Sequence, residues 1–325
     1  MIQNDEKVEG RIIIGADVAK ASIVLKQLRD GRPVCAGVQT IPNKAADITK
    51  ALIDLGQIDL IVCEVTGGYE RQLLEAATKL SIPIHRADGA RVKAFITSHG
   101  VRAKTDAIDA YGLALYGQDR FNSLQNWTPP DPKREELQSL VKHRQALMDQ
   151  RTMATNRSKA PNSCHIADFL NAEISFINTQ INKIEQQIAD LMKSDATIKA
   201  QEKRLRAIKG IGPVSAHTLI AMLPELGHAT RKQIACLAGL APHPAQSGNS
   251  FKKYPMTGGR DLIRRTLFMA ALTASRCHPD LKHFYQNLLS NKKPKKLALA
   301  AVARKLVTIA NAVLKPVHIS DAQLT

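Results

Sequence analysis

Four carboxylates in the first third of the chain are the residues best suited to chemistry. Asp17 follows a short apolar run, Glu64 ends another, and Asp106 and Asp109 lie three residues apart in a segment of helical composition. Residues at i and i+3 share a helix face, so Asp106 and Asp109 can point at one spot. Carboxylates gathered in one place repel one another unless a cation joins them, and hard oxygen ligands suit Mg²⁺ or Mn²⁺. The set predicts a divalent-metal site.

The charge of the chain indicates what such a site would act on. Its 325 residues include 46 Lys and Arg against 29 Asp and Glu, a net charge of +17. This excess favours a polyanionic partner. Aromatic residues make up only 4% of the chain, which argues against base stacking as the main mode of binding. A carboxylate cluster on a basic protein predicts metal-assisted cleavage of phosphodiesters, in which two cations stabilise the attacking and leaving oxygens.

Each acid also has a plainer interpretation. Asp17 is able to cap a turn, and Asp106 and Asp109 are typical of the first turn of an ordinary helix. Glu64 is harder to explain in this way, because a carboxylate within an apolar run is expected to be buried, and an unpaired buried charge is costly. The four acids together are therefore more specific than any one of them.

Strand patterns dominate the first part of the chain. We expect strands at residues 11–14, 21–28, 34–41, 60–65 and 82–85, helices at 44–55 and 69–80, and a Gly-Ala-Asp turn after the first strand. An early hairpin followed by alternating helix and strand predicts an α/β layer with a mixed sheet. Carboxylates at the ends of neighbouring central strands would then lie close together.

A proline-rich segment at 125–132 ends the strand pattern. Residues 135–159 are helical in composition, and apolar residues then recur at alternating spacings of four and three, as in a heptad seam. These residues are Leu170, Ile174, Ile177, Ile181, Ile184, Ile188 and Leu191. We interpret 135–198 as a helical hairpin that packs on itself or pairs with another subunit. The predicted domains are 1–127, 128–200 and 201–325.

Residues 204–216 fit a helix-hairpin-helix motif. Gly210 and Gly212 would then expose backbone N–H groups at the start of a helix, where a phosphate can bind. The alternative is a plain helix-turn-helix with glycines at a C-cap. Further helices are expected at 231–240, 260–277 and 296–315, so this part of the chain is mainly α-helical.

A loop of Ser, Gly and Asn at 246–250 precedes a group of cations. The loop composition alone favours a simple turn. Guanidinium groups, however, clamp phosphates in a bidentate manner, and a serine beside them, Ser247 or Ser250, can attack a phosphodiester, with His243 as a candidate base. The sequence alone does not choose among these residues. The residues expected to bind nucleic acid are Lys104, which precedes the Asp106 helix, and Lys252, Lys253, Arg260, Arg264 and Arg265.

The five cysteines are scattered, with no Cys-x-x-Cys pair, which predicts reduced thiols. The chain shows no apolar signal core and no apolar run of membrane-spanning length. We therefore expect a cytoplasmic protein without a membrane partner.

Seven short stretches, in order along the chain, resemble one family. They are 15–20 (Gly-Ala-Asp-Val-Ala-Lys), 64–69 (Glu-Val-Thr-Gly-Gly-Tyr), 104–110 (Lys-Thr-Asp-Ala-Ile-Asp-Ala), 208–212, 237–242 (Leu-Ala-Gly-Leu-Ala-Pro), 247–248 (Ser-Gly) and 264–270. The chain resembles the bacterial insertion-sequence transposases that have a RuvC-like Asp-Glu-Asp-Asp domain and a C-terminal serine domain. That group includes guide-RNA-directed (bridge-RNA) recombinases and Piv DNA invertases. Ala16 stands where Ile or Val is commoner in the family.

The resemblance implies an α/β RNase H/RuvC-like N-terminal domain, a helical coiled-coil hairpin, and a mainly α C-terminal domain with a helix-hairpin-helix. It implies that Asp17, Glu64, Asp106 and Asp109 bind Mg²⁺ or Mn²⁺, and that Ser247 is the nucleophile that holds the DNA covalently. It further implies donor and target DNA as substrates, an element-encoded guide RNA, and a homo-oligomer, dimer or tetramer, in which one subunit's acids meet another's serine. The expected location is the bacterial cytoplasm, in association with the nucleoid.

Three other functions stay open at this point. A RuvC-like nuclease or junction resolvase would need the four acids and a water nucleophile, but not Ser247. An actin-like or sugar-kinase-like ATPase also opens with Gly-x-Asp after a first strand, although no second Gly-rich phosphate loop follows. A non-catalytic binding protein would use only the basic surface.

Overall fold

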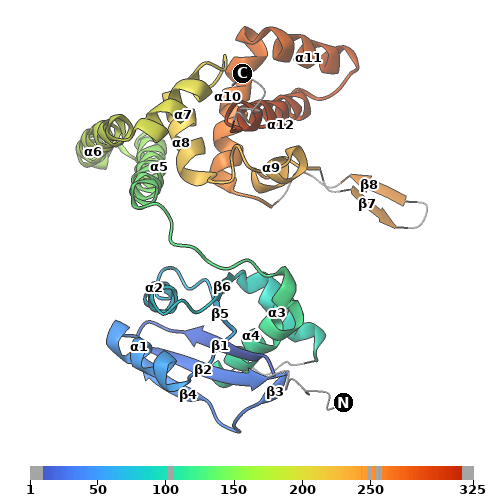
Figure 1. Ribbon diagram of the computed structural model, residues 1–325. Coiled ribbons are helices and arrows are strands. Elements are labelled where there is room, and N and C mark those ends of the chain that lie inside the picture. The colour runs from blue at the N-terminus through green and yellow to red at the C-terminus, as the bar shows by residue number, and fades with distance from the viewer. Residues whose placement is uncertain are drawn as a thin grey trace, which may run out of the picture. The chain divides into compact units, whose positions relative to one another are not determined.

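The computed structural model describes residues 10–100, 105–242, 244–247, 250–253, 256 and 258–316, with the backbone alone at 244–247 and 250–253. The chain forms two compact units, Met1–Pro129 and Pro130–Thr325, and each is described by itself (Figure 1). The three-domain division at 127/128 and 200/201 stays a prediction. Within the described residues, no helix combines the length and the apolar character needed to span a bilayer.

The first unit is built on a mixed sheet, as predicted, and this sheet has six strands where five were expected. Its strands are β1 Ile12–Val18, β2 Ser22–Arg29, β3 Arg32–Pro33, β4 Gln39–Pro42, β5 Leu60–Glu64 and β6 Ile84–Ala87. The order across the sheet is β3-β2-β1-β5-β6, with β4 also paired to β2. Strands β1, β5 and β6 are parallel, whereas β2 is antiparallel to β1.

Helices cover both faces of this sheet. Side chains alternate between the two faces along each strand, and because both faces carry apolar residues, each is buried under helices. The helices are α1 Ala45–Asp54, α2 Arg71–Lys79, α3 Gly89–Ser98 and α4 Asp106–Arg120, followed by the short 3-10 helix Phe121–Ser123. Along β1, Ile12 and Ile14 join the core under α1 and α2, while Ile13 joins the core under α3 and α4. Figure 1 shows α1 and α4 on opposite sides of the sheet.

The first strand is longer than predicted. The expected Gly-Ala-Asp turn ending at Asp17 is wrong, because β1 pairs with β2 along its whole length, and Ala16 and Val18 are buried in the core. The chain reverses after Val18 instead, where the Ala19 N–H donates to the Ser22 carbonyl oxygen at 2.9 Å. Asp17 is thus a strand residue, and the sheet fixes the direction of its side chain.

The single strand predicted at 34–41 is also wrong. Two short strands, β3 and β4, flank an exposed segment instead. Lys26 of β2 is only 6% exposed, and its Nζ donates to the carbonyl oxygens of Cys35, Ala36 and Gly37 at 2.7, 3.1 and 2.7 Å. Because the ammonium group takes these carbonyl oxygens, they are not available for a strand ladder.

The second unit is mainly α-helical. Its helices are α5 Pro132–Ser158, α6 Ala167–Ser194, α7 Ala196–Arg206, α8 Pro213–Met222, α9 Arg231–Leu237, α10 Asp261–Cys277, α11 Pro279–Ser290 and α12 Lys295–Val313, with a 3-10 turn at Cys164–Ile166. A hairpin of two strands, β7 Pro244–Ser247 and β8 Ser250–Lys253, lies between α9 and α10 in the sequence.

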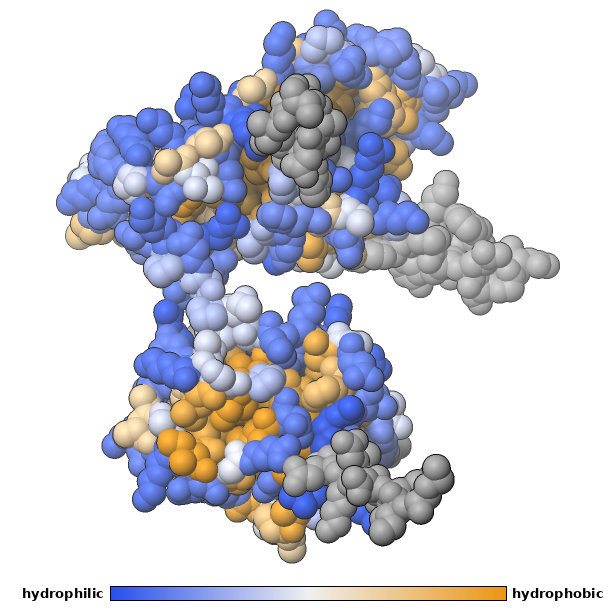
Figure 2. Space-filling view, in the orientation of Figure 1, coloured by the Kyte–Doolittle hydropathy of each residue, from blue (hydrophilic) through white to orange (hydrophobic). Residues whose placement is uncertain are grey.

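Helices α5 and α6 pack side by side (Figure 1). The predicted apolar series makes this contact: Ile177, Ile181 and Ile188 are at most 4% exposed and share a core with Leu137 of α5. The same core continues into the later helices. Figure 2 shows mostly hydrophilic residues on the visible side of α5 and α6, while Phe169 and Phe176 of α6 are 78% and 63% exposed. The hairpin therefore packs on its own chain, and coiled-coil geometry stays a prediction.

Candidate active site

Asp17 and Glu64 occupy the same level of two adjacent parallel strands. The last paired row of β1 and β5 joins Ala16 to Cys63, so the two acids are the next residue on each strand. Paired residues of parallel strands point to the same face of a sheet. Ile13 of β1 and Val62 of β5 face the core under α3 and α4, and alternation places both carboxylates on that face. Both acids are half-buried.

Helix α4 brings the other two acids towards this edge of the sheet. A Cβ at Gly15 would lie 1.9 Å from the carbonyl oxygen of Ala110, and one at Gly117 would lie 2.8 Å from the side chain of Ile13, two residues earlier on β1. The helix therefore runs antiparallel to β1 in close contact with it, and its N-terminal end lies towards Asp17. The first turn of α4 carries Asp106 and Asp109. The fold thus directs all four predicted acids to one edge.

Glu64 also lies at the start of α3. A Cβ at Gly89, the first residue of that helix, would lie 2.0 Å from the Glu64 Oε1. Helix N-termini favour negative charge. Asp88, the N-cap of α3, accepts a hydrogen bond from the Arg91 N–H at 3.0 Å. This fifth carboxylate at the same edge was missed, although an Asp between a strand and a helix is itself a sequence signal for an N-cap.

The carboxylates fit a divalent cation in donor chemistry, since Mg²⁺ and Mn²⁺ prefer hard oxygen ligands. Among the residues that the structure describes, however, no three His, Cys, Asp or Glu side chains stand close enough to hold one ion. The acids therefore share an edge and a face of the sheet without forming a closed metal site. Their role as metal ligands stays a prediction.

Glu70 is a buried acid that the sequence analysis missed. Its side chain is 1% exposed and pairs with Arg86 of β6 at 2.6 Å. It also accepts hydrogen bonds from the backbone N–H groups of Thr66 and Gly68, at 3.2 and 2.8 Å. Burial by itself would raise the pKa of Glu70, but these donors outweigh it and lower the pKa to about 2. Glu70 thus anchors the loop that directly follows Glu64.

Ser247 is the last residue of β7 and is paired with Ser250 of β8. Both are described by their backbone only, as are Lys252 and Lys253 on β8. Lys104, His243 and Gly248 lie outside the described residues. The roles predicted for Ser247 and for these lysines therefore stay predictions.

The three arginines predicted to bind phosphate all contact carboxylates of their own unit. Arg260 forms a bidentate pair with Glu225 at 2.6 and 2.7 Å. Burial acts to raise the pKa of Glu225, but hydrogen bonding by Arg260 holds that pKa below its usual value. Arg264 and Arg265 both bind Asp261, at 2.5 and 2.8 Å. These guanidinium groups thus have partners within the second unit, and their contact with nucleic acid stays a prediction.

Two glycines close the base of the β7–β8 hairpin. Gly239 precedes the hairpin and Gly259 follows it, with φ values of 67° and 64°. A Cβ at Gly259 would lie 2.2 Å from the Gly239 nitrogen, and the Arg260 N–H donates to the Leu237 carbonyl oxygen at 2.9 Å. The two chain segments that bear the hairpin are therefore in backbone contact, which fixes where the Ser247 strand leaves the helical core.

The two glycines of the proposed helix-hairpin-helix differ in their surroundings. Gly210 has a φ of 108°, and a Cβ there would lie 2.5 Å from the Ala274 Cβ of α10. Gly210 is therefore required by helix packing. Gly212, the N-cap of α8, has no neighbour within 4 Å of its Cβ position. Phosphate binding by either glycine, and the motif itself, stay predictions.

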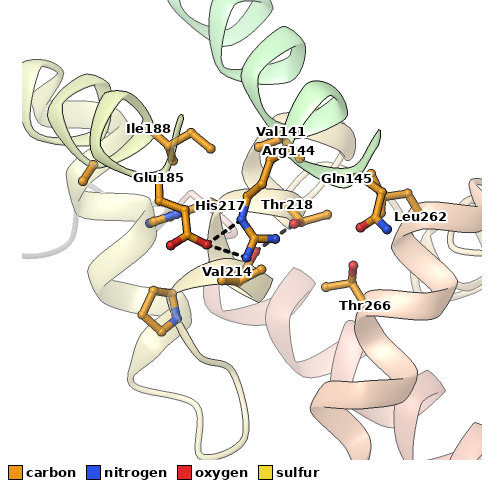
Figure 3. Close-up of a pocket in the computed structure, with 12 residues that line it drawn as sticks. Val141, Arg144, Gln145, Glu185, Ile188, Val214, His217, Thr218, Leu262 and Thr266 are labelled. Carbon is orange, nitrogen blue, oxygen red and sulfur yellow. Dashed lines mark hydrogen bonds and ion pairs between the residues drawn. The ribbon is translucent and has the colours of Figure 1, made fainter. Parts of the chain in front are cut away.

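A cavity of about 360 Å³ opens in the second unit between α5, α6, α8 and α10 (Figure 3). Apolar side chains such as Val141 and Leu262 line it, together with Arg144, which pairs with Glu185 at 2.6 Å. None of the predicted site residues lines this cavity. The sequence did not indicate it, because its walls come from four separate helices.

Two family matches cover most of the chain. Residues 14–160 match a transposase domain of the DEDD, IS110 type, and residues 202–286 match the transposase IS116/IS110/IS902 family. The pilin gene-inverting protein of Moraxella bovis is 29% identical over 259 residues, which are 78% of this chain and 80% of that protein. The pilin gene-inverting protein of Moraxella lacunata matches to the same extent.

Two further proteins match over shorter lengths. A probable family 20 transposase of Pseudomonas aeruginosa is 28% identical over 150 residues, 45% of this chain and 43% of that protein. Among solved structures, Thermus thermophilus RuvC aligns with a TM-score of 0.30 and 13% identity, covering 36% of this chain and 99% of RuvC.

Proposed function

The chain belongs to the IS116/IS110/IS902 family of transposases, and from this premise we propose that it is a DNA recombinase with two sets of catalytic residues. One set is the acidic edge formed by Asp17, Glu64, Asp106 and Asp109. The other is Ser247 on the β7–β8 hairpin. The substrates are donor and target DNA, which suits the chain's net charge of +17.

The placement of Asp17 and Glu64 carries this proposal. The two carboxylates lie one residue beyond the last paired row of β1 and β5, and α4, which covers that face of the sheet, carries Asp106 and Asp109 in its first turn. Asp17 and Asp109 are 92 positions apart in the sequence, and both belong to elements that meet at this edge of the sheet.

These four acids are the residues that would hold a divalent cation. When bound, Mg²⁺ or Mn²⁺ supplies charge stabilisation for the attacking and leaving oxygens of a phosphodiester. Glu70 and Arg86 contribute by fixing the loop after Glu64. The backbone contact between Gly15 and Ala110 contributes by fixing the distance of α4 from β1.

Ser247 is the proposed nucleophile. Its hydroxyl oxygen forms a bond to phosphorus, the bond from phosphorus to the leaving sugar oxygen breaks, and that oxygen takes up a proton. The resulting phosphoserine keeps the energy of the phosphodiester, so a sugar hydroxyl of a second strand can displace the serine and restore it. The support for this step is the family resemblance around Ser247 and Gly248.

The remaining parts of the proposal also derive from the family. An element-encoded RNA would select donor and target DNA, and a dimer or tetramer would bring one subunit's acids to another's serine. The Moraxella relatives are named for inverting a pilin gene. Inversion and transposition differ in the arrangement of the DNA sites and can use the same strand exchange.

A recombination assay with Mg²⁺, the DNA that flanks the coding region and the RNA transcribed from it would test the proposal. We expect strand joining by the wild type, and loss of joining in Asp17→Ala and in Ser247→Ala. A phosphoserine–DNA adduct should accumulate when the joining strand is omitted. Undiminished joining by Ser247→Ala would exclude the serine step. Metal-dependent cleavage without any adduct would point instead to a nuclease or junction resolvase that uses water.

A further inference from the structure

Asn43 links the backbone that follows Asp17 to the backbone that follows Glu64. Its side-chain amide donates to the carbonyl oxygens of Ala19 at 2.9 Å and of Tyr69 at 3.0 Å. Asn43 is only 8% exposed. A buried amide that donates to two carbonyl oxygens keeps the two loops at a fixed separation, and so makes one continuous surface from the β1–β2 and β5–α2 connections.

The β5–α2 loop is held from a second direction by Glu70. This buried carboxylate accepts from the N–H of Gly68 at 2.8 Å, directly before Tyr69, and from the Thr66 hydroxyl at 2.8 Å. The backbone of Tyr69 is therefore tied on both sides. Its side chain nevertheless stays 47% exposed. The exposed aromatic ring therefore stands on a firmly held loop, which begins directly after Glu64 in the sequence.

Two lysines belong to the same surface. Lys20 lies between Ala19 and Ala21, and both of these neighbours accept hydrogen bonds from Asn43, the second from its backbone N–H at 2.9 Å. Lys44 directly follows Asn43. Both lysines are exposed, and neither forms an ion pair within the part of the chain that the structure describes. Their charges are therefore free to meet an external anion.

An exposed aromatic ring and two exposed ammonium groups on linked loops have the chemistry of a nucleic-acid contact. Lysine neutralises phosphate groups, and unpaired bases stack on aromatic side chains. We propose that Lys20, Lys44 and Tyr69 form a binding surface for a single strand of DNA and lead its phosphodiester to the Asp17–Glu64 edge. This inference rests on the proposed function of that edge.

A single strand fits this surface better than a duplex does. Tyr69 can stack only on a base whose face is open, and bases inside a duplex are covered by their neighbours. Gly67 and Gly68 are both exposed and have positive φ values of 78° and 119°. The loop thus presents backbone without side chains next to the ring, which lets a strand approach closely.

The test measures DNA binding without divalent metal, by fluorescence anisotropy over roughly 50 to 200 mM salt. The variants are Lys20→Gln, Lys44→Gln, Tyr69→Ala and Tyr69→Phe, with Lys79→Gln as the control. Lys79 is equally exposed on the same unit, but it ends α2 at the opposite end of the sheet. This assay measures DNA binding separately from DNA cleavage. A wild-type protein that binds single-stranded DNA but never cleaves DNA would therefore contradict the proposed function and leave this inference standing.

We expect each lysine substitution to reduce the slope of log K against log salt by about 0.7 for single-stranded DNA. Tyr69→Ala should weaken binding of single-stranded DNA about tenfold, while Tyr69→Phe keeps the ring and the affinity. Slopes and affinities that match those of Lys79→Gln would overturn the inference. A loss confined to RNA, with DNA binding unchanged, would also overturn it, because the surface would then serve a guide RNA.

Asn43→Asp tests whether the link itself matters. The change keeps the shape of the side chain but removes both N–H donors, so the Tyr69 loop should separate and single-strand binding should fall as in Tyr69→Ala. The control is Asn311→Asp in the second unit, where a 1% exposed amide likewise bridges two backbone groups, Gly227 and Ala229. Equal single-strand affinity of folded Asn43→Asp and Asn311→Asp would contradict the role given to Asn43.

Discussion

Gly15 lies against Ala110 with no room for a side chain between the strand and the helix. A Cβ at Gly15 would come within 1.9 Å of the Ala110 carbonyl oxygen. This contact sets how closely α4 approaches β1, and therefore how far the acids of the first helical turn lie from Asp17. A residue with no functional group thus controls the geometry of the candidate active site.

Gly15→Ala should damage this geometry. The added methyl group must push α4 away, and we expect a loss of about 1 to 3 kcal/mol in the free energy of unfolding from overpacking. A shift of about 1 Å in the acids should lower the cleavage rate on the order of a hundredfold. Urea unfolding and a metal-dependent cleavage assay measure the two effects. The matched control is Gly37→Ala, whose Cβ position has no neighbour within 4 Å. Equal behaviour of the two variants would contradict this account.

Glu70 should make the stability of the fold depend on pH. Its pKa is lowered from 4.5 to about 2. A carboxylate with a folded pKa below its unfolded pKa stabilises the fold above the unfolded value, and this contribution disappears as the pH falls from about 4.5 towards 2. At neutral pH the contribution is on the order of 3 kcal/mol.

The measurement compares urea unfolding of wild type and Glu70→Gln. The difference between them should be large near neutral pH and should shrink steadily below about pH 4.5. Glu75→Gln is the control, because Glu75 forms an exposed pair with Arg71 and exposed pairs contribute about 1 kcal/mol or less. A Glu70→Gln difference that stays constant between neutral and acid pH would show that the charge of Glu70 is not what stabilises the loop.

The base of the β7–β8 hairpin offers a pair of adjacent glycines for comparison. Gly258 and Gly259 both have positive φ, 74° and 64°, so alanine strains the backbone at either position. Only Gly259 also touches another backbone, with its Cβ position 2.2 Å from the Gly239 nitrogen, whereas Gly258 has open space. Gly259→Ala should therefore force the hairpin away from the helical core.

We expect Gly259→Ala to lose strand joining by about a hundredfold while DNA retention stays near that of wild type. Gly258→Ala should lose only the stability due to its backbone strain, about 1 to 3 kcal/mol, and should still join strands. Joining and gel-shift assays on the two proteins side by side provide the measurement. Similar joining rates for the two variants would show that the glycine contact does not position Ser247.

Local patterns were enough to predict much of the fold. The apolar run that ends at Glu64, the periodic isoleucines of α6 and the alternation of helix and strand all depend on neighbours close in sequence. The turn assigned to Gly-Ala-Asp failed because composition favours a turn there, while the ladder with β2 comes from residues further along the chain. Tertiary pairing overrode the local preference.

The missed site residues share one property, which is that their partners are distant in sequence. Glu70 is recognisable as an anchor only when Arg86 of β6 is placed beside it. Arg260 looked like a phosphate clamp because Glu225 is 35 residues away. Asn43 was not singled out in the sequence, because its role depends on Ala19 and Tyr69. No local pattern reports such contacts.

Lys26 also affects how the sheet can interact with other protein molecules. Its ammonium group donates to the carbonyl oxygens of Cys35, Ala36 and Gly37. A long edge strand with unpaired N–H and C=O groups can pair with a strand of another molecule, and such pairing can start aggregation. Beyond β2, this edge consists of two short strands, β3 and β4. They are separated by residues 35–37, whose carbonyl oxygens accept hydrogen bonds from Lys26. This edge of the sheet is thereby less open to pairing with a strand of another chain.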